Sequence, residues 1–198
     1  MSKIFNFGFD FKGMKFVDIL RNFFLFFVVF AFCGWIYEEI VFIVEEHMLV
    51  NRGVLFGPWL PVYGVGGFLI VMLFYRYKDK KIKIGNINIR PLVILIEASL
   101  LAVIVELITT YIIDFTGGNF KDLWDYSGNI LNYQGRIALI PGLKFGVIAL
   151  FGIYFVQPLL NKFIKEDRVV VDSTTLVLFI FFMIDVISRI WLGNNYIR

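Results

Sequence analysis

The sequence predicts an all-α protein, a polytopic bundle of transmembrane helices in which residues 1–198 form a single membrane domain. Hydrophobic residues make up 59% of the chain and charged residues 18%, and the mean hydropathy is +0.79. A water-soluble domain of this length could not cover so much apolar surface. Apolar runs of about 20 residues, the length that crosses the hydrocarbon core of a bilayer, alternate with polar segments. Each spanning run should be helical, because lipid offers no water to satisfy open backbone groups.

Five apolar runs have the required length. We expect spans at residues 22–44, 54–75, 91–113, 137–160 and 174–193. Polar segments separate the later spans, and Pro91 suits the first turn of the third span because its missing N–H has no partner there. Residues 1–21 precede the first span, and we expect them to form an arm at the cytosolic interface.

Lysine and arginine are distributed unevenly between the two sides of this bundle. The arm and the segments 76–90 and 161–172 are rich in both, whereas the segments on the other side contain few. Basic loops of membrane proteins remain in the cytosol. We therefore place the N-terminus in the cytosol and the C-terminus outside, in a multi-pass protein of the cell membrane.

Nearly all charged residues inside the spans lie in the outer half of the membrane, and Glu97, near the cytosolic end of the third span, is the exception. Glu38, Glu106 and Asp185 lie in the outer halves of the first, third and fifth spans. A charge at the centre of a spanning helix costs roughly 2.5–3.5 kcal/mol, so it persists where it is paired or lines a wet cavity. Basic residues, whose charge is opposite to that of these acids, lie at a similar depth: Arg52, Arg136, Lys144 and Arg189.

Residues 51–67, NRGVLFGPWLPVYGVGG, place helix breakers at the depth of these acids. Pro58 and Pro61 remove backbone donors, and irregular backbone at this depth is tolerated where it lines protein or water. We therefore expect an outward-facing polar pocket for a substrate or an ion. Its expected members are Glu38, Asn51, Arg52, Gly53, Glu106, Trp124, Asp125, Tyr126, Asn132, Gly135, Arg136, Asp185 and Arg189.

Two interpretations remain open for the glutamates of this pocket. Glu38 and Glu106 form an ion, proton or substrate site, or they are structural, each protonated or paired with an arginine. We predict that both glutamates form one desolvated network with Arg52 and Arg136. Asp185 and Arg189 are four residues apart and can pair along one helix face.

The long outer segment 114–136 also has two interpretations. Trp124, Asp125 and Tyr126 form a lid over the pocket, since long loops in compact proteins are often functional. Alternatively, they anchor the segment at the membrane interface, where tryptophan and tyrosine are enriched.

A weak internal sequence similarity favours a parallel repeat, in which the third and fourth spans repeat the first and second. In both copies an intraspan glutamate is followed by an outer loop, an Asn near Gly and Arg, a proline and a glycine-containing span. The first copy has Glu38, Asn51-Arg52-Gly53, Pro58 and Gly64, and the second has Glu106, Asn132, Gly135-Arg136, Pro141 and Gly146.

Several function classes find no support in the sequence. The chain has no phosphate-binding GxxxxGK[ST] loop, HExxH pair or CxxC motif. His47 beside two glutamates is a poor metal signal, and Cys33, the one cysteine, excludes an internal disulfide. We expect no metal, no cofactor, no catalytic residues and no nucleic-acid partner.

Several irregular blocks resemble, in order, a family of small multispanning proteins identified as ABC-transporter permeases, to which vertebrate transmembrane relatives are also similar. The blocks are GWIYEE, NRGVLFGPWLPVYGVGG, VELITTYIID, LWDYSGNILNYQGRIAL and the late Asp185, over roughly residues 30–190. After RIAL the family pattern has Trp-Gly, where this chain has Phe145-Gly146. The resemblance implies a transporter permease subunit, and its ATPase would be a separate cytosolic partner.

Two alternatives to a transporter component remain. Carboxylates and arginines around a wet pocket suit an intramembrane enzyme or binding protein acting on lipid headgroups at the outer leaflet, although no nucleophile–base pair is recognisable. A structural or sensor protein of the membrane is the other. We favour the transporter component, which is not itself an enzyme.

Overall fold

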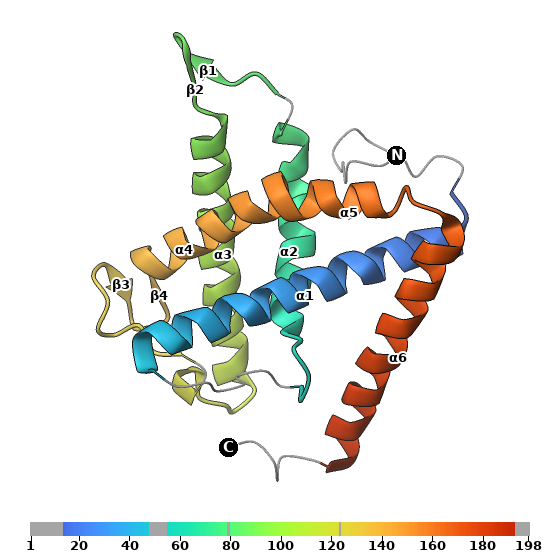
Figure 1. Cartoon of the computed structure of the whole chain (residues 1–198). Helices are drawn as coiled ribbons and strands as arrows, with labels where there is room; N and C mark the ends of the chain where they lie inside the picture. The colour runs from blue at the N-terminus through green and yellow to red at the C-terminus, as the bar shows by residue number, and fades with distance from the viewer. Residues whose placement is uncertain (1–13, 48–54, 79, 123, 193–198) are drawn as a thin grey trace.

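A computed structural model describes residues 14–47, 55–78, 80–122 and 124–192, and over these ranges the chain is an all-α bundle with little sheet, as the sequence predicts (Figure 1). The α-helices are α1 (Phe16–Glu46), α2 (Pro61–Phe74), α3 (Arg90–Phe115), α4 (Leu139–Phe151), α5 (Gln157–Phe163) and α6 (Arg168–Leu192). A π-helical segment, η3 (Gly152–Val156), joins α4 to α5 without a break, and two short 3-10 helices are η1 (Tyr75–Tyr77) and η2 (Phe120–Asp122). Two hairpins complete the described chain: β1 (Lys83–Ile84) with β2 (Ile87–Asn88), and β3 (Asn132–Tyr133) with β4 (Ile137–Ala138).

Four helical segments in the described residues are long and apolar enough to cross a membrane. They are Phe16–Val44, Arg90–Phe115, Leu139–Phe163 and Arg168–Leu192. The chain is therefore a membrane protein with several transmembrane helices. These four segments correspond to the first, third, fourth and fifth expected spans, and α1 begins at Phe16, within the segment expected to be an interfacial arm.

The second expected span is helical only in part. The helix α2 begins at Pro61 and has 14 residues, and residues 55–60 before it are not helical. Prolines at 58 and 61 explain this start, because each lacks an N–H and disfavours helix in the residue before it. The irregular backbone is satisfied within the protein, since the Leu60 N–H donates to the Ala31 carbonyl of α1 at 3.2 Å.

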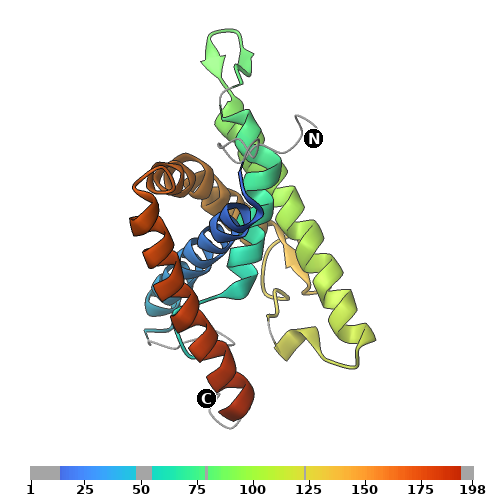
Figure 2. The same cartoon turned by 90° about the vertical axis from the view of Figure 1, so that its right-hand side faces the viewer.

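The helices pack as two pairs, with α6 at one edge. The most extensive contacts are those of α1 with α2 and of α3 with α4. Figure 2 shows α6 crossing in front of α1, with α3 on the other side of the molecule. Phe24 and Phe27 of α1 meet α6 edge-on, each with a ring centroid within about 6 Å of the Phe182 ring. The α6 helix is thus attached mainly to the first pair.

The packing within the two pairs corresponds residue by residue, which supports the hypothesis of a parallel repeat. Gly64 of α2 packs on Phe27, and Gly146 of α4 packs on Leu95. Phe27 precedes Glu38 by eleven residues (38 − 27), and Leu95 precedes Glu106 by the same number (106 − 95). In each pair, therefore, a glycine of the second helix lies against the first helix at the same distance from the intraspan glutamate.

Burial follows the same correspondence. A shift of 68 residues leads from a position in α1 to the equivalent position in α3, as from Glu38 to Glu106. A shift of 82 residues leads from α2 to the segment formed by α4 and η3, as from Gly64 to Gly146. The same shifts relate fully buried residues in the main core: Phe26 to Ile94, and Val71 to Ile153. They also relate Tyr63 to Phe145, whose ring centroids are 6.2 Å apart. Equivalent residues in contact are expected at a local two-fold axis between related halves.

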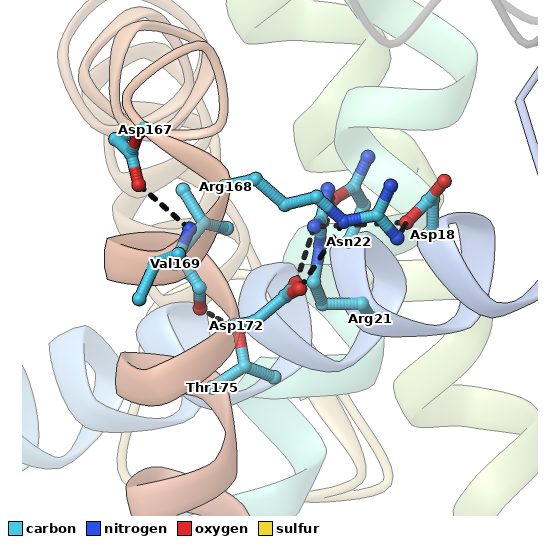
Figure 3. A network of polar contacts seen from close by, with 9 residues as sticks. Asp18, Arg21, Asn22, Asp167, Arg168, Val169, Asp172 and Thr175 are labelled. Carbon is cyan, nitrogen blue, oxygen red and sulfur yellow. Dashed lines mark hydrogen bonds and ion pairs between the residues drawn. The ribbon is translucent and has the colours of Figure 1, made fainter.

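A network of charges ties the start of α6 to the start of α1 (Figure 3). Arg21 contacts Asp172 at 2.6 Å, and Arg168 contacts Asp18 at 3.1 Å and Asp172 at 3.3 Å. Two acids and two bases balance each other there. Arg21 also donates to the side-chain oxygen of Asn22, which is fully buried.

Candidate functional site

Two glutamates from different spanning helices each accept a hydrogen bond from a tyrosine. Glu38 of α1 accepts from the phenol of Tyr63, in the first turn of α2. Glu106 of α3 accepts from the phenol of Tyr126, in the segment that follows α3, at 2.9 Å. Both carboxylates are partly buried. We call these four residues the Glu–Tyr cluster.

Electrostatics connect the two halves of the Glu–Tyr cluster. Burial raises the pKa of the Tyr126 phenol above its ordinary value, and the charge of Glu106, the hydrogen bond to it and the charge of Glu38 raise that pKa further. Tyr126 therefore stays protonated and remains a donor at neutral pH. The charge of the α1 carboxylate thus acts on the tyrosine that the α3 carboxylate binds.

Small residues of α1 and aromatic rings position Tyr63 beside Glu38. Gly34 lies one turn before Glu38, and a Cβ atom there would collide with the Tyr63 ring. On its other sides Tyr63 meets Tyr37 and Phe145, each with ring centroids 6.2 Å away. The absence of a side chain at Gly34 thus makes room for the tyrosine.

The segment after α3, residues 116–138, is folded back on itself and brings Tyr126 to the cluster. The Trp124 indole donates to the Arg136 carbonyl at 2.9 Å, and the Tyr126 N–H donates to the Gly135 carbonyl at 2.8 Å. Asn132 accepts from the Gly135 N–H at 3.1 Å and donates to the Asn129 carbonyl at 2.9 Å. Gly135 adopts a positive φ of 71°, which favours glycine. These side chains hold the segment together, and Tyr126 alone among them bonds a membrane carboxylate.

Asp125 lies on the outside of this folded segment. Its carboxylate accepts from the backbone N–H of Ser127 at 2.9 Å and from the Ser127 hydroxyl at 2.5 Å, and it pairs with Lys121 at 3.2 Å. The Ser127 bonds hold the pKa of Asp125 below its ordinary value. Asp125 is exposed and stabilises the turn rather than the cluster.

Arg136 pairs with a different acid from the one expected. Its guanidinium contacts Asp114, at the end of α3, at 2.5 Å, and lies over the rings of Tyr111 and Phe120 at 4.6 and 4.2 Å. Glu106 instead binds Tyr126, so the expected pairing of Arg136 with a glutamate is replaced by one with Asp114. The two aromatic rings explain this, because they hold the guanidinium at the C-terminal end of α3.

Asp185 and Arg189 meet the irregular backbone before α2. The two carboxylate oxygens of Asp185 accept from the N–H groups of Phe56 and Gly57, each at 2.9 Å. The Arg189 guanidinium lies 5.5 Å from the centroid of the Phe56 ring. A pocket of about 430 Å3 opens beside them, bounded by residues 56–59 and by α6 from Phe181 to Ser188. Asp185 therefore ties α6 to residues 55–60.

Three expected members of the pocket, Asn51, Arg52 and Gly53, lie outside the described residues. Among the described residues, no group of three or more His, Cys, Asp or Glu could hold a metal ion. Tyr63 belongs to the cluster although the sequence did not single it out. Its signal was its place two residues after Pro61, in the helix expected to face the glutamates.

Comparison with known proteins gives a family match. A protein-family model described as "Putative ABC-transporter type IV" matches residues 25–190. This range takes in most of the chain, including both glutamates, the folded segment after α3 and Asp185. Searches of curated proteins and of solved structures found no match.

Proposed function

This chain belongs to the ABC-transporter type IV family, and we propose that it is the permease-like component of a transporter in the cell membrane, with the Glu–Tyr cluster as its substrate-handling centre. The observation that carries the proposal is that each helix pair has a partly buried glutamate bonded to a tyrosine, Glu38 to Tyr63 and Glu106 to Tyr126. Carboxylates inside a bilayer are costly, and they mark substrate or ion pathways by default.

The geometry of the cluster suits a centre that changes shape during transport. One tyrosine comes from α2 and the other from the outer segment, so neither bond lies within a single helix. A movement of α2 against α1, or of residues 124–136 against α3, would break one bond and free a carboxylate for a substrate. Tyr126 would then act as the contact between the cluster and a lid formed by residues 124–136.

A permease must also bind an ATPase on the cytosolic side. The β1–β2 hairpin offers a surface to which an ATPase could bind. The hairpin projects from the bundle between α2 and α3 (Figure 1). Ile84 and Ile87 on it are 68% and 71% exposed, and the exposed Lys81 and Lys83 lie beside them. The positive-inside rule places this hairpin in the cytosol. Exposed apolar residues rimmed by charge are typical of protein contact sites.

Affinity purification from native membranes in mild detergent tests the proposed partner. We expect an ATPase to co-purify with the wild type and to be lost from the variant Ile84→Ser/Ile87→Ser. The matched control is Ile130→Ser/Leu131→Ser, which removes two similarly exposed apolar residues just before the other hairpin. Recovery of no ATPase with the wild type, or equal recovery with both variants, would contradict the permease assignment.

A further inference from the structure

An apolar groove of about 390 Å3 lies between α1, the η3–α5 segment and α6. Its volume falls in the range of roughly 300–1,000 Å3 that is usual for pockets of small ligands. Thr174 and Cys33 are the least apolar of its lining residues, and the rest are aliphatic or phenylalanine. The groove is separate from the Glu–Tyr cluster and shares no residue with it.

The groove runs along the helices, from one end of the bundle toward its middle. Its lining residues on α1 extend from Leu25 to Cys33, which is about 12 Å along the axis at 1.5 Å per residue. On α6 they are Thr174 and Leu178, near the first turns of that helix. The length is close to the thickness of one leaflet of hydrocarbon, about 15 Å.

Two lysines lie at the end of the groove where α5 finishes and α6 begins. Lys162 and Lys165 are exposed, and neither makes an ion pair with a residue that the structure describes. Lys162 follows Leu159, which lines the groove, by three residues and therefore lies on the same helix face. By contrast, Arg168 beside them is already paired with Asp18 and Asp172.

We propose that this groove binds a phospholipid, with an acyl chain along the apolar walls and the phosphate at Lys162 and Lys165. An empty groove on a membrane-facing surface would leave its walls without contact atoms, whereas an acyl chain fills it. A lysine ammonium binds phosphate through charge-assisted hydrogen bonds, and basic residues beside grooves between spanning helices recognise lipid headgroups in this way. The same leaflet of the bilayer supplies both parts of the ligand.

Cys33 provides a direct readout of occupancy, because it is the single cysteine of the chain and lines the groove. The full-length protein would be delipidated in dodecyl maltoside, and the rate of alkylation of Cys33 by N-ethylmaleimide measured. We expect added phosphatidylglycerol to slow alkylation at least about fivefold, a change of about 1 kcal/mol. Diacylglycerol with the same acyl chains, and inorganic phosphate alone, should each leave the rate unchanged.

A pair of charge-reversal variants tests the headgroup position. Lys162→Glu/Lys165→Glu should abolish the protection by phosphatidylglycerol, and Lys81→Glu/Lys83→Glu, with two exposed lysines of another segment reversed, should retain it. Equal protection by diacylglycerol, protection by phosphate alone, or no protection by phosphatidylglycerol would each overturn the proposal. These three outcomes are read on the wild type, so the test stands even where a variant fails to fold.

Discussion

At the scale of single residues, the tyrosine phenols decide how the buried carboxylates are satisfied. A phenol is a neutral donor, so it can bond a carboxylate in an apolar setting without introducing a second charge. Glu106 lies two helical turns from the buried Ser99, on a face that packs against α4. An arginine there would have to be desolvated together with the glutamate, whereas Arg136 finds Asp114 at the helix end.

Replacing Tyr126 by phenylalanine tests the bond to Glu106. The variant keeps the ring and removes the donor, so we expect a loss of about 1–3 kcal/mol of unfolding free energy, the usual range for a hydrogen bond to a charged or buried group. Hydrogen exchange of residues 124–136 should accelerate as the segment loosens. Tyr154→Phe is the control, because the buried Tyr154 hydroxyl has no hydrogen-bond partner in the described structure. Equal exchange in both variants would show that the Glu106 bond does not hold the segment.

The turn formed by Asp125 should loosen in acid. The Ser127 bonds hold the pKa of Asp125 below its ordinary value, so the folded state favours the ionised carboxylate. This stabilisation is present above the pKa of the unfolded chain and is lost as the pH falls through the folded pKa. Hydrogen exchange of residues 125–135, corrected for intrinsic rates, should rise in that acidic window in the wild type. The variant Asp125→Asn should show no such rise, and an equal rise in both would refute the assignment.

At the scale of elements, helix contacts in the two pairs depend on glycine. In α2, a Cβ atom at Gly64 would lie 2.6 Å from the Phe27 ring and 2.8 Å from the Phe27 carbonyl oxygen, and that backbone atom cannot move away as a side chain can. The equivalent Gly146 of α4 would meet the Leu95 carbonyl at 2.7 Å. Close approach at these two glycines sets the distance between the helices, as small residues do in membrane bundles.

Gly64→Ala and Gly66→Ala form a matched test of this packing. Both sites are in α2, but a Cβ atom at Gly66 would meet nothing within 4 Å. We expect Gly64→Ala to lower the free energy of unfolding by about 1–3 kcal/mol through overpacking. Gly66→Ala should be neutral or slightly stabilising, because alanine favours helix over glycine. Thermal unfolding in detergent gives the comparison, and similar melting temperatures for the two variants would contradict close packing at Gly64.

The attachment of α6 depends on charges at its first turns. Arg21 is largely buried and contacts Asp172 at 2.6 Å, so Arg21→Gln should leave the Asp172 carboxylate with Arg168 alone. We expect a modest loss of stability, because Asp172 is exposed and solvent screens the pair, although Arg21 itself is largely buried. The control Lys15→Gln changes an exposed base just before α1. Faster hydrogen exchange in residues 168–178 of Arg21→Gln alone would confirm the attachment, whereas unchanged exchange would refute it.

At the scale of the whole molecule, the class of fold could be predicted from the sequence. Apolar runs of spanning length sufficed for this, because lipid forces such runs into helices. The depth of Glu38 and Glu106 in the membrane stays a prediction, based on the cost of a charge in hydrocarbon. Which partner each carboxylate takes depends on tertiary contacts between distant segments, such as Glu106 with Tyr126, and no local pattern encodes it. The same holds for Asp185, whose partners are backbone N–H groups at Phe56 and Gly57.

The two helix pairs correspond in sequence position and packing, and their glutamates lie at equivalent positions. Glu38 and Glu106 occupy equivalent places in the two pairs, and the influence of Glu38 on Tyr126 joins their surroundings. We therefore expect the two glutamates to act as one unit. Substitutions of residues that act as a unit are not additive, whereas those of independent residues are.

The measurement that tests this claim most directly is ATP hydrolysis by the chain reconstituted in liposomes with its co-purified ATPase. The comparison is between the wild type, Glu38→Gln, Glu106→Gln and the double variant. We expect each single variant to lower the rate by about tenfold, or about 1.4 kcal/mol, and the double variant to be no slower than the slower single one. Wild-type rates in both single variants, with the ATPase still bound, would show that the Glu–Tyr cluster is structural and that transport does not use it.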